Sequence, residues 1–366
     1  MSRAMKYLMS VSLVCAAAGI LICPAELSEA VRSSVYGCLE VVIPALFAFT
    51  VLAVYMQQSG LYCTALRPLT LPLSKLLGIP EELCAVFLLS NIGGYPVGAR
   101  LLGGLVRSGR LSRQNAGKML CFCYGSGPSF VIGTAGMRVL GSAAAGGILF
   151  GACFLSSFIL AVILCRTGDR ITLENGCEPS GGLDLSADCF IRSVDSGARV
   201  MYTVCVMAAA FSAVTALLDA AGITGLAARI LELAGAGENS SRIIPALLEV
   251  TRVRELLPAG AAAPLCAGLL SFGGVCVLMQ ITAVSGGDIP VKPLVISRLP
   301  AAAMSAVFAI PAGLIPSPAA EAYSPGASAA VGEAFSVNAG MSVSVLIMAG
   351  ILIYSVESAK KKDQYR

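Results

Sequence analysis

The chain has 366 residues, of which 57% are apolar and only 13% charged, and its mean hydropathy is +0.83. A soluble domain carries about 25% charged residues, so this composition excludes a disordered chain and predicts an integral membrane protein. The absence of histidine excludes His-ligated metals and Ser-His-Asp triads, and a net charge of +4 predicts no nucleic-acid partner.

Long apolar runs recur along the chain, and a spanning helix needs about 20 such residues. The first run follows Arg3 and Lys6 and resembles a signal peptide, but no convincing cleavage site follows, so we expect a retained anchor. The lipid bilayer is therefore a predicted partner, and a homo-oligomer is left open. Uninterrupted spans are predicted at Tyr7–Cys23, Val35–Met56, Gly141–Cys165, Val200–Ala221, Leu294–Ile315 and Ser342–Tyr354.

Four other apolar stretches are interrupted by glycine, proline and polar residues. Non-helical backbone at membrane depth must be buried in protein or line a wet cavity, and in transporters such breaks form the solute site. The first and third stretches are expected to be re-entrant hairpins, and the second and fourth broken membrane helices. The stretches are Pro80–Leu105, Met119–Val139, Ile243–Leu257 and Pro264–Val284.

Basic residues predict the orientation of a membrane protein because they concentrate in cytoplasmic loops. If the N-terminus is cytoplasmic and each hairpin returns to its own side, most Lys and Arg residues fall in cytoplasmic segments, Arg298 among them. The sequence therefore predicts a multi-pass plasma-membrane protein with both termini in the cytoplasm. Only four basic residues fall outside, namely Arg32, Arg138, Arg229 and Arg242.

The same order of elements occurs twice, and Tyr124–Thr134 aligns with Phe272–Thr282. An odd number of crossings separates the two copies, so the second is inverted. We therefore expect an all-α polytopic membrane protein with two inverted repeats, each containing a re-entrant helical hairpin and a broken transmembrane helix. The predicted parts are an anchor and outer loop (1–34), transport repeat 1 (35–165), a cytoplasmic linker (166–199), transport repeat 2 (200–315), and an outer loop, final helix and basic tail (316–366).

Three motifs carry a resemblance to a known family. Asn91–Arg100 (NIGGYPVGAR) resembles the Gly-Tyr-Pro hairpin segment of sporulation integral membrane proteins, and Tyr124–Thr134 is similar to that family's Gly-Pro break. Ser271–Gly274 resembles the break of the second repeat. One departure is that Val277 and Leu278 stand where the family carries a polar residue before Met-Gln, which bears on the substrate.

This resemblance covers about residues 35–310. The family belongs to a wider group with nucleoside-recognition or gate domains, and it is similar in layout to concentrative nucleoside transporters. Membership would imply transport of dipicolinate during endospore formation, out of the mother cell across the outer forespore membrane.

If the hairpin tips and breaks meet, their backbone and side chains form a polar site. Half-helices that start after Gly127 and Gly274 offer free N–H groups to a carboxylate. Arg100 or Arg252 could pair with a second carboxylate, and Glu249 could carry a proton or pair with Arg252. The predicted substrate-binding residues are Asn91, Gly93, Gly94, Tyr95, Arg100, Tyr124, Ser126, Gly127, Ser129, Glu249, Thr251, Arg252, Gly273, Gly274 and Gln280.

Simpler roles exist for the same residues. The glycine pairs could only permit close helix packing, Arg100 could be a cytoplasmic anchor for its hairpin, and Arg252 could pair with a glutamate at the outer surface. Thr251 and Gln280 could each join helices by a hydrogen bond.

We expect a secondary transporter or facilitator for a small organic anion that works by alternating access at a midplane site. No cofactor, metal or catalytic activity is predicted, because histidine, paired aspartates within spans and an activated nucleophile are all lacking. A nucleoside or purine carrier is an alternative, favoured by fewer Arg and more Asn, Gln or Glu at the site. A non-transporting structural membrane protein required for sporulation is another.

Overall fold

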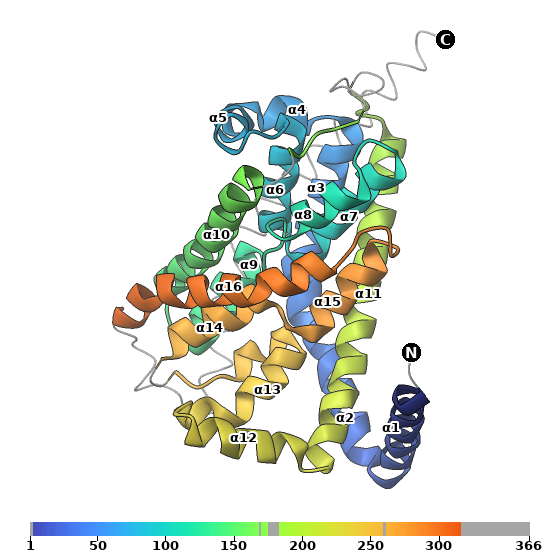
Figure 1. Cartoon of the computed structure of the whole chain (residues 1–366), viewed down its shortest axis with the longest axis vertical. Coiled ribbons are helices and arrows are strands. Elements are labelled where there is room, and N and C mark those ends of the chain that lie inside the picture. The colour runs from blue at the N-terminus through green and yellow to red at the C-terminus, as the bar shows by residue number, and fades with distance from the viewer. Residues whose placement is uncertain (1–2, 168–169, 175–182, 259–260, 316–366) are drawn as a thin grey trace.

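The computed structural model describes residues 3–167, 170–174, 183–258 and 261–315. The predicted final helix Ser342–Tyr354 lies outside these ranges. Every regular element within them is helical (Figure 1). The first half contains α1 (Arg3–Ile22), α2 (Pro24–Gly37), η1 (Cys38–Val42), α3 (Ile43–Ser59), α4 (Tyr62–Ala65), α5 (Arg67–Leu77), α6 (Glu81–Gly93), α7 (Tyr95–Arg107), α8 (Arg113–Leu120), α9 (Pro128–Phe130), η2 (Val131–Val139) and α10 (Ala143–Arg166).

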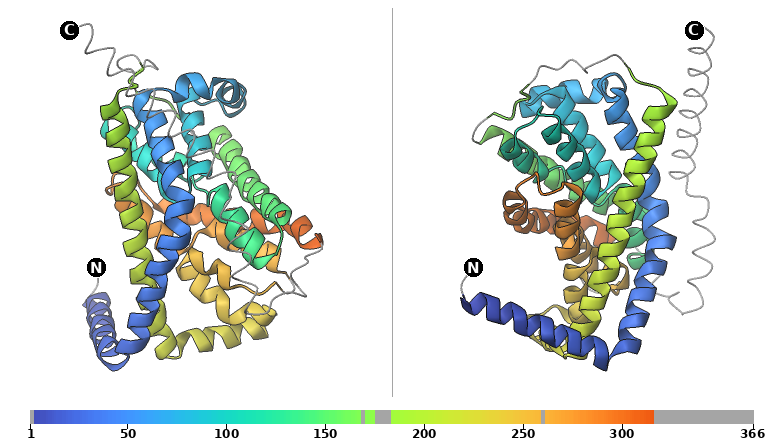
Figure 2. Two further views of the ribbon diagram at one scale, coloured as in Figure 1. Left: turned by 180° about the vertical axis from the view of Figure 1, so that it is seen from behind. Right: turned by 90° about the vertical axis from the view of Figure 1, so that its right-hand side faces the viewer.

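The second half is built from α11 onward, and α11 runs alongside α2 and α3 (Figure 2). Its elements are α11 (Ala187–Ala220), α12 (Ile223–Leu233), η3 (Gly237–Asn239), α13 (Ser240–Leu248), η4 (Val250–Glu255), α14 (Ala262–Phe272), α15 (Gly274–Val284), α16 (Lys292–Phe308) and η5 (Ile310–Leu314).

Several helices are long and apolar enough to cross a membrane, which supports the predicted multi-pass class. A bent pair, α5 and α6, meets at 109° and is a sixth candidate. Helix α1 is not among the candidates, so the crossing predicted at Tyr7–Cys23 stays a prediction. The five candidates are Pro24–Ser59, Ala143–Arg166, Ala187–Ala220, Ala262–Val284 and Lys292–Leu314.

The first predicted hairpin is a pair of helices, α6 and α7. The chain reverses at Gly94, whose φ of +95° favours glycine. At the open end the Arg110 guanidinium, just beyond α7, forms an ion pair with Glu82 near the start of α6, and its Nη1 lies 2.7 Å from Oε1. The hairpin therefore begins and ends at the same end of the molecule. Its re-entry into a bilayer stays a prediction.

The second predicted hairpin is shorter and less regular. Its first arm is α13, but its second arm is η4, a six-residue 3-10 helix. The Asn239 side chain joins the open end, since its Nδ2 donates to the Leu257 carbonyl (3.2 Å) and its Oδ1 accepts from the Leu257 N–H (2.8 Å). The open end of the first hairpin is thus joined by an ion pair, and that of the second by the amide of one asparagine.

Both broken spans are interrupted where predicted, and each hairpin tip packs on the break of its own half. A Cβ on Gly125, in the first break, would lie 2.7 Å from Asn91 Oδ1. A Cβ on Gly274, in the second, would lie 3.2 Å from the Leu247 carbonyl oxygen. Glycine is required for this approach of tip to break. The element order is shared between the halves, while their inverted relation stays a prediction.

One end of the molecule gathers basic residues from several elements. Arg166, at the end of α10, donates to the Leu76 carbonyl of α5 (3.0 Å). The Glu174 N–H donates to the carbonyl of Arg110 (3.0 Å). Helix α11 also begins here (Figure 1). We call this region the linker end, because α10 ends there and α11 begins there. The sequence predicts that this end faces the cytoplasm.

Replacing Glu82 with alanine should loosen the first hairpin. Glu82 is buried, and its loss would leave the partly buried Arg110 guanidinium without a carboxylate, which costs about 3 kcal/mol. We expect the free energy of unfolding, measured in detergent, to fall by about that amount. Glu81→Ala is the matched control, since Glu81 forms no ion pair in the described ranges. Equal stability of the two variants would show that the ion pair contributes nothing.

Candidate functional site

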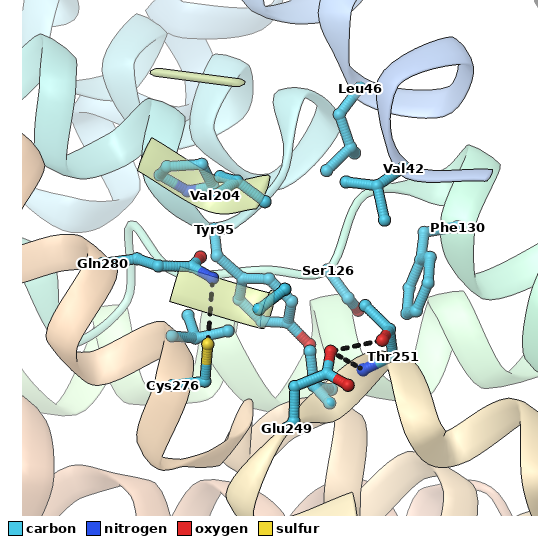
Figure 3. A pocket seen from close by; sticks show the side chains of 14 residues that line it. Val42, Leu46, Tyr95, Ser126, Phe130, Val204, Glu249, Thr251, Cys276 and Gln280 are labelled. Carbon is cyan, nitrogen blue, oxygen red and sulfur yellow. Dashed lines mark hydrogen bonds between the residues drawn. The ribbon is translucent and has the colours of Figure 1, made fainter. Parts of the chain in front are cut away.

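A cavity of about 30 Å³ lies between the two halves (Figure 3). Both hairpin tips, both broken spans, α11 and the η1–α3 region contribute to its wall. Most of the wall is apolar, and the polar groups gather on one side. The lining residues are Val42, Leu46, Tyr95, Pro96, Ser126, Phe130, Val204, Ala208, Glu249, Val250, Thr251, Cys276, Val277 and Gln280.

Glycine and proline bring these segments together. Gly127 has a φ of +71° and is followed by Pro128, which starts α9, a position at which proline loses no helical hydrogen bond. Gly273 and Gly274 have φ values of +82° and +80° and divide α14 from α15. Left-handed backbone at these positions ends one helical segment and redirects the next.

Glu249 is the charged residue of the cavity, and its side chain is 3% exposed. It lies between α13 and η4, where its Oε1 accepts from the backbone N–H of Thr251 (3.2 Å) and from the Thr251 hydroxyl. No Lys or Arg forms an ion pair with it in the described part of the chain. Arg252 and Arg254 act on it only from beyond ion-pair distance. A buried carboxylate outside an ion pair is costly, so this one invites a functional explanation.

Two further polar groups face the cavity with unused hydrogen-bonding capacity. Ser126 is 4% exposed, and its Oγ has no partner among the residues that the structure describes. Gln280 donates its amide to Cys276 Sγ (3.2 Å), a weak acceptor. Buried polar atoms normally find partners, so Ser126 in particular points to an occupant that supplies one.

Behind the cavity, α14 ends inside the molecule, and its last carbonyls have no helical partner. Three side chains donate to three successive carbonyl oxygens: Tyr95 to Leu270 (2.6 Å), Arg298 to Ser271 (3.2 Å) and Tyr124 to Phe272 (2.9 Å). The rings of Tyr95 and Tyr124 are in contact, with centroids 4.9 Å apart. Side chains therefore complete the hydrogen bonds that the break removes.

Arg298 corrects a prediction from the sequence. It was assigned to a cytoplasmic segment, but it is fully buried (0% exposed). Its guanidinium donates to the carbonyl oxygens of Ser271 and Cys121, one at each break, and lies 4.3 Å from the centre of the Tyr124 ring. The sequence could have indicated this burial, because Arg298 is a single arginine inside the predicted span Leu294–Ile315.

Five of the predicted site residues line the cavity: Tyr95, Ser126, Glu249, Thr251 and Gln280. Seven others form or support the tips and breaks around it: Asn91, Gly93, Gly94, Tyr124, Gly127, Gly273 and Gly274. Asn91 shows how, because its amide donates to the carbonyls of Phe87 (2.9 Å) and Phe122 (3.3 Å).

The remaining three predicted residues lie away from the lining. Arg100 Nε donates to Ser196 Oγ on α11 (2.7 Å), and Arg252 pairs with Glu255 (3.4 Å); Ser129 is the third. The two arginines that were expected to pair with a carboxylate therefore do not contribute to the cavity. The lining residues that the sequence did not predict are apolar. Nothing in the sequence distinguishes them from apolar residues of an ordinary packed core.

No family model, curated protein sequence or solved structure matches this chain. The resemblance to sporulation membrane proteins therefore depends on the sequence motifs alone.

Replacing Arg298 with methionine should destabilise the fold. The change relieves the cost of burying a charge, but it leaves the carbonyls of Cys121 and Ser271 without a donor. Each such group costs about 1–3 kcal/mol, so we expect unfolding in detergent to require about 2–4 kcal/mol less. Arg298→Lys separates charge from geometry, since one ammonium keeps the charge but lacks the fork that reaches both carbonyls. If both variants unfold like wild type, Arg298 does not join the breaks.

Proposed function

We propose that this protein is a secondary transporter or facilitator that moves a small organic solute across a membrane by alternating access. The observation that carries the proposal is the buried Glu249 carboxylate, which forms no ion pair in the described ranges, beside two helix breaks in a bundle of membrane-length helices. Intramembrane ionisable groups and discontinuous helices are features of solute pathways.

The size of the cavity supports alternating access. Its volume of about 30 Å³ has room for about two water molecules, which is too little for an organic solute. The lining segments must therefore separate before a solute enters. Because they come from both halves of the chain, a movement of one half against the other would open the site.

The resemblance to sporulation proteins favours a small organic anion, dipicolinate above all, carried across the outer forespore membrane. Helix α15 begins beside the cavity, and its N-terminal N–H groups suit a carboxylate. Glu249 opposes a dianion by charge repulsion, and Arg100 and Arg252 lie elsewhere. A dianion would therefore bind only with Glu249 protonated.

A nucleoside or purine carrier is favoured by the side chains of the cavity itself. Glu249 offers a carboxylate to ring or ribose donors, while Ser126, Thr251 and Gln280 offer neutral hydrogen bonds. The apolar remainder of the wall suits the faces of a heterocyclic ring. This chemistry makes the nucleoside class the better fit of the two.

A binding screen separates the proposals. We expect the purified protein in detergent to bind a purine nucleoside with a larger increase in melting temperature than dipicolinate gives at the same concentration. Uptake into reconstituted vesicles then tests transport. If neither solute binds and uptake equals that of empty vesicles, the transporter proposal fails, and a structural role in sporulation takes its place.

Glu249→Gln gives opposite outcomes for the two substrate classes. A hydrogen bond to a charged group contributes about 1.5–3 kcal/mol, so we expect nucleoside affinity to fall at least about tenfold. Affinity for dipicolinate should instead rise, because the repelling charge is gone. Calorimetry measures both, with Glu255→Gln as the control, since Glu255 pairs with Arg252 outside the cavity. An unchanged affinity for both solutes would remove Glu249 from the site.

A further inference from the structure

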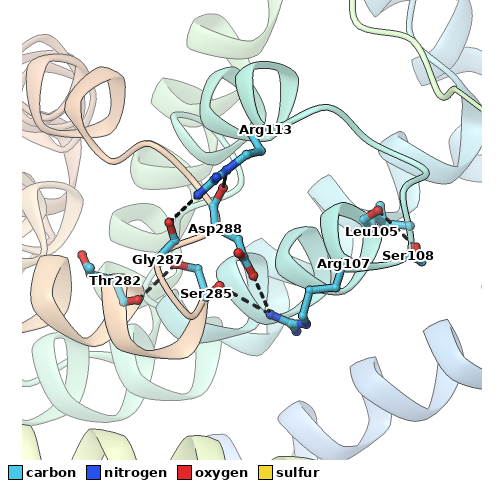
Figure 4. A network of polar contacts seen from close by, with 8 residues as sticks. All are labelled: Leu105, Arg107, Ser108, Arg113, Thr282, Ser285, Gly287 and Asp288. Carbon is cyan, nitrogen blue, oxygen red and sulfur yellow. Dashed lines mark hydrogen bonds and ion pairs between the residues drawn. The ribbon is translucent and has the colours of Figure 1, made fainter.

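A polar network joins the two halves of the chain at the linker end (Figure 4). Arg107, the last residue of α7, lies 3.4 Å from an Asp288 carboxylate oxygen and 3.4 Å from the Ser285 carbonyl. Arg113, the first residue of α8, donates from Nε to the Asp288 carbonyl (2.7 Å) and from Nη2 to the Gly287 carbonyl (2.9 Å). Two arginines of the first half thus hold the turn after α15.

The helices that meet at this network also line the cavity. Helix α7 begins with Tyr95 and Pro96, and α15 contributes Cys276 and Gln280. Both helices run from the cavity to the linker end. From Cys276 to the turn at Ser285 is nine residues, or about 14 Å of helix.

Helices α7 and α15 pack on each other between the cavity and the linker end. At Gly103, on α7, a Cβ would lie in ordinary contact with the Cα of Ser285, at 3.5 Å. The backbone of α7 therefore lies against the end of α15 just below the network.

We propose that Arg107, Arg113 and Asp288 form a latch that closes the linker-end route to the cavity, and that α7 and α15 separate when the latch opens. The strength of the contacts suits a reversible latch. The side chains of Arg107 and Asp288 are 43% and 34% exposed, and exposed ion pairs are weak. The buried Glu82–Arg110 pair behind it keeps the first hairpin together while the latch moves.

Native Cys276 reports on the latch, because it lines the cavity and is 1% exposed. The experiment measures the rate of N-ethylmaleimide labelling of Cys276 in the full-length protein in detergent, with the labelled peptide identified by mass spectrometry. In Arg107→Ala/Arg113→Ala we expect labelling about tenfold faster than in wild type, equivalent to about 1.4 kcal/mol. Cys276→Ala confirms the assignment of the labelled peptide.

The matched control is Asp195→Ala, which removes an exposed ion pair of similar kind within α11 (Arg199 Nε to Asp195, 2.9 Å). It should label at the wild-type rate. An unchanged rate in folded Arg107→Ala/Arg113→Ala protein overturns the proposal, as does an equal acceleration in the control.

A second variant decides the matter if the double alanine protein does not fold. Gly103→Cys/Ser285→Cys places two thiols within reach of a disulfide across the same interface. Oxidation should slow Cys276 labelling at least about tenfold, and prior reduction should restore it. A labelling rate that is the same with and without the crosslink overturns the proposal.

The latch depends on the proposed function only for the identity of the cavity as the solute site. Labelling of Cys276 measures access and needs no solute. If labelling responds as expected while vesicle uptake is absent, the latch stands and the transporter proposal fails. If uptake occurs but the labelling rate is unchanged in both variants, the latch proposal fails and the transporter proposal stands.

Discussion

The end of α14 imposes the constraint on which the centre of this protein depends. A helix that stops in a low-dielectric interior leaves carbonyl oxygens that water cannot reach, and each must find a donor. Tyr95, Arg298 and Tyr124 supply three donors to three successive carbonyls. Arg298 also reaches the first break at Cys121. One guanidinium therefore ties together both breaks and α16.

These side chains differ in what they hold. The hydroxyls of Tyr95 and Tyr124 and the two Nη atoms of Arg298 donate to backbone carbonyls beside the breaks, so they hold the breaks in position. The groups with spare hydrogen-bonding capacity, Glu249 and Ser126, lie on the cavity side. Tyr95 belongs to both sets, because its ring lines the cavity while its hydroxyl completes α14. Movement at the cavity is thus coupled to the hydrogen bonds behind it.

Composition and the positions of glycine and proline were enough to predict helices of membrane-spanning length, the two breaks and the reversal of the chain between α6 and α7. Glu249 was also predicted, because a carboxylate in an apolar stretch is conspicuous. Arg298 was missed, since counting basic residues by side assigns a charge to a loop even when its neighbours are apolar. The positions of Val42 and Val204 in the cavity wall could not be predicted, because the sequence pattern of apolar residues is the same whether they face a core or a cavity. The short second hairpin arm was also missed, since periodicity does not distinguish a 3-10 turn from a helix over six residues.

The arms of the two hairpins differ in length and regularity. The parts of the cavity wall that they carry are therefore held by different numbers of backbone hydrogen bonds. Tyr95 is the first residue of α7, a helix of 13 residues. Glu249 instead has an extended backbone and lies between a nine-residue helix and a 3-10 helix. Few backbone hydrogen bonds resist its displacement there. The charged group of the cavity therefore lies on a short, irregular segment. In the proposed transporter, a solute that attracts or repels this charge would act on a segment that few backbone hydrogen bonds hold in place.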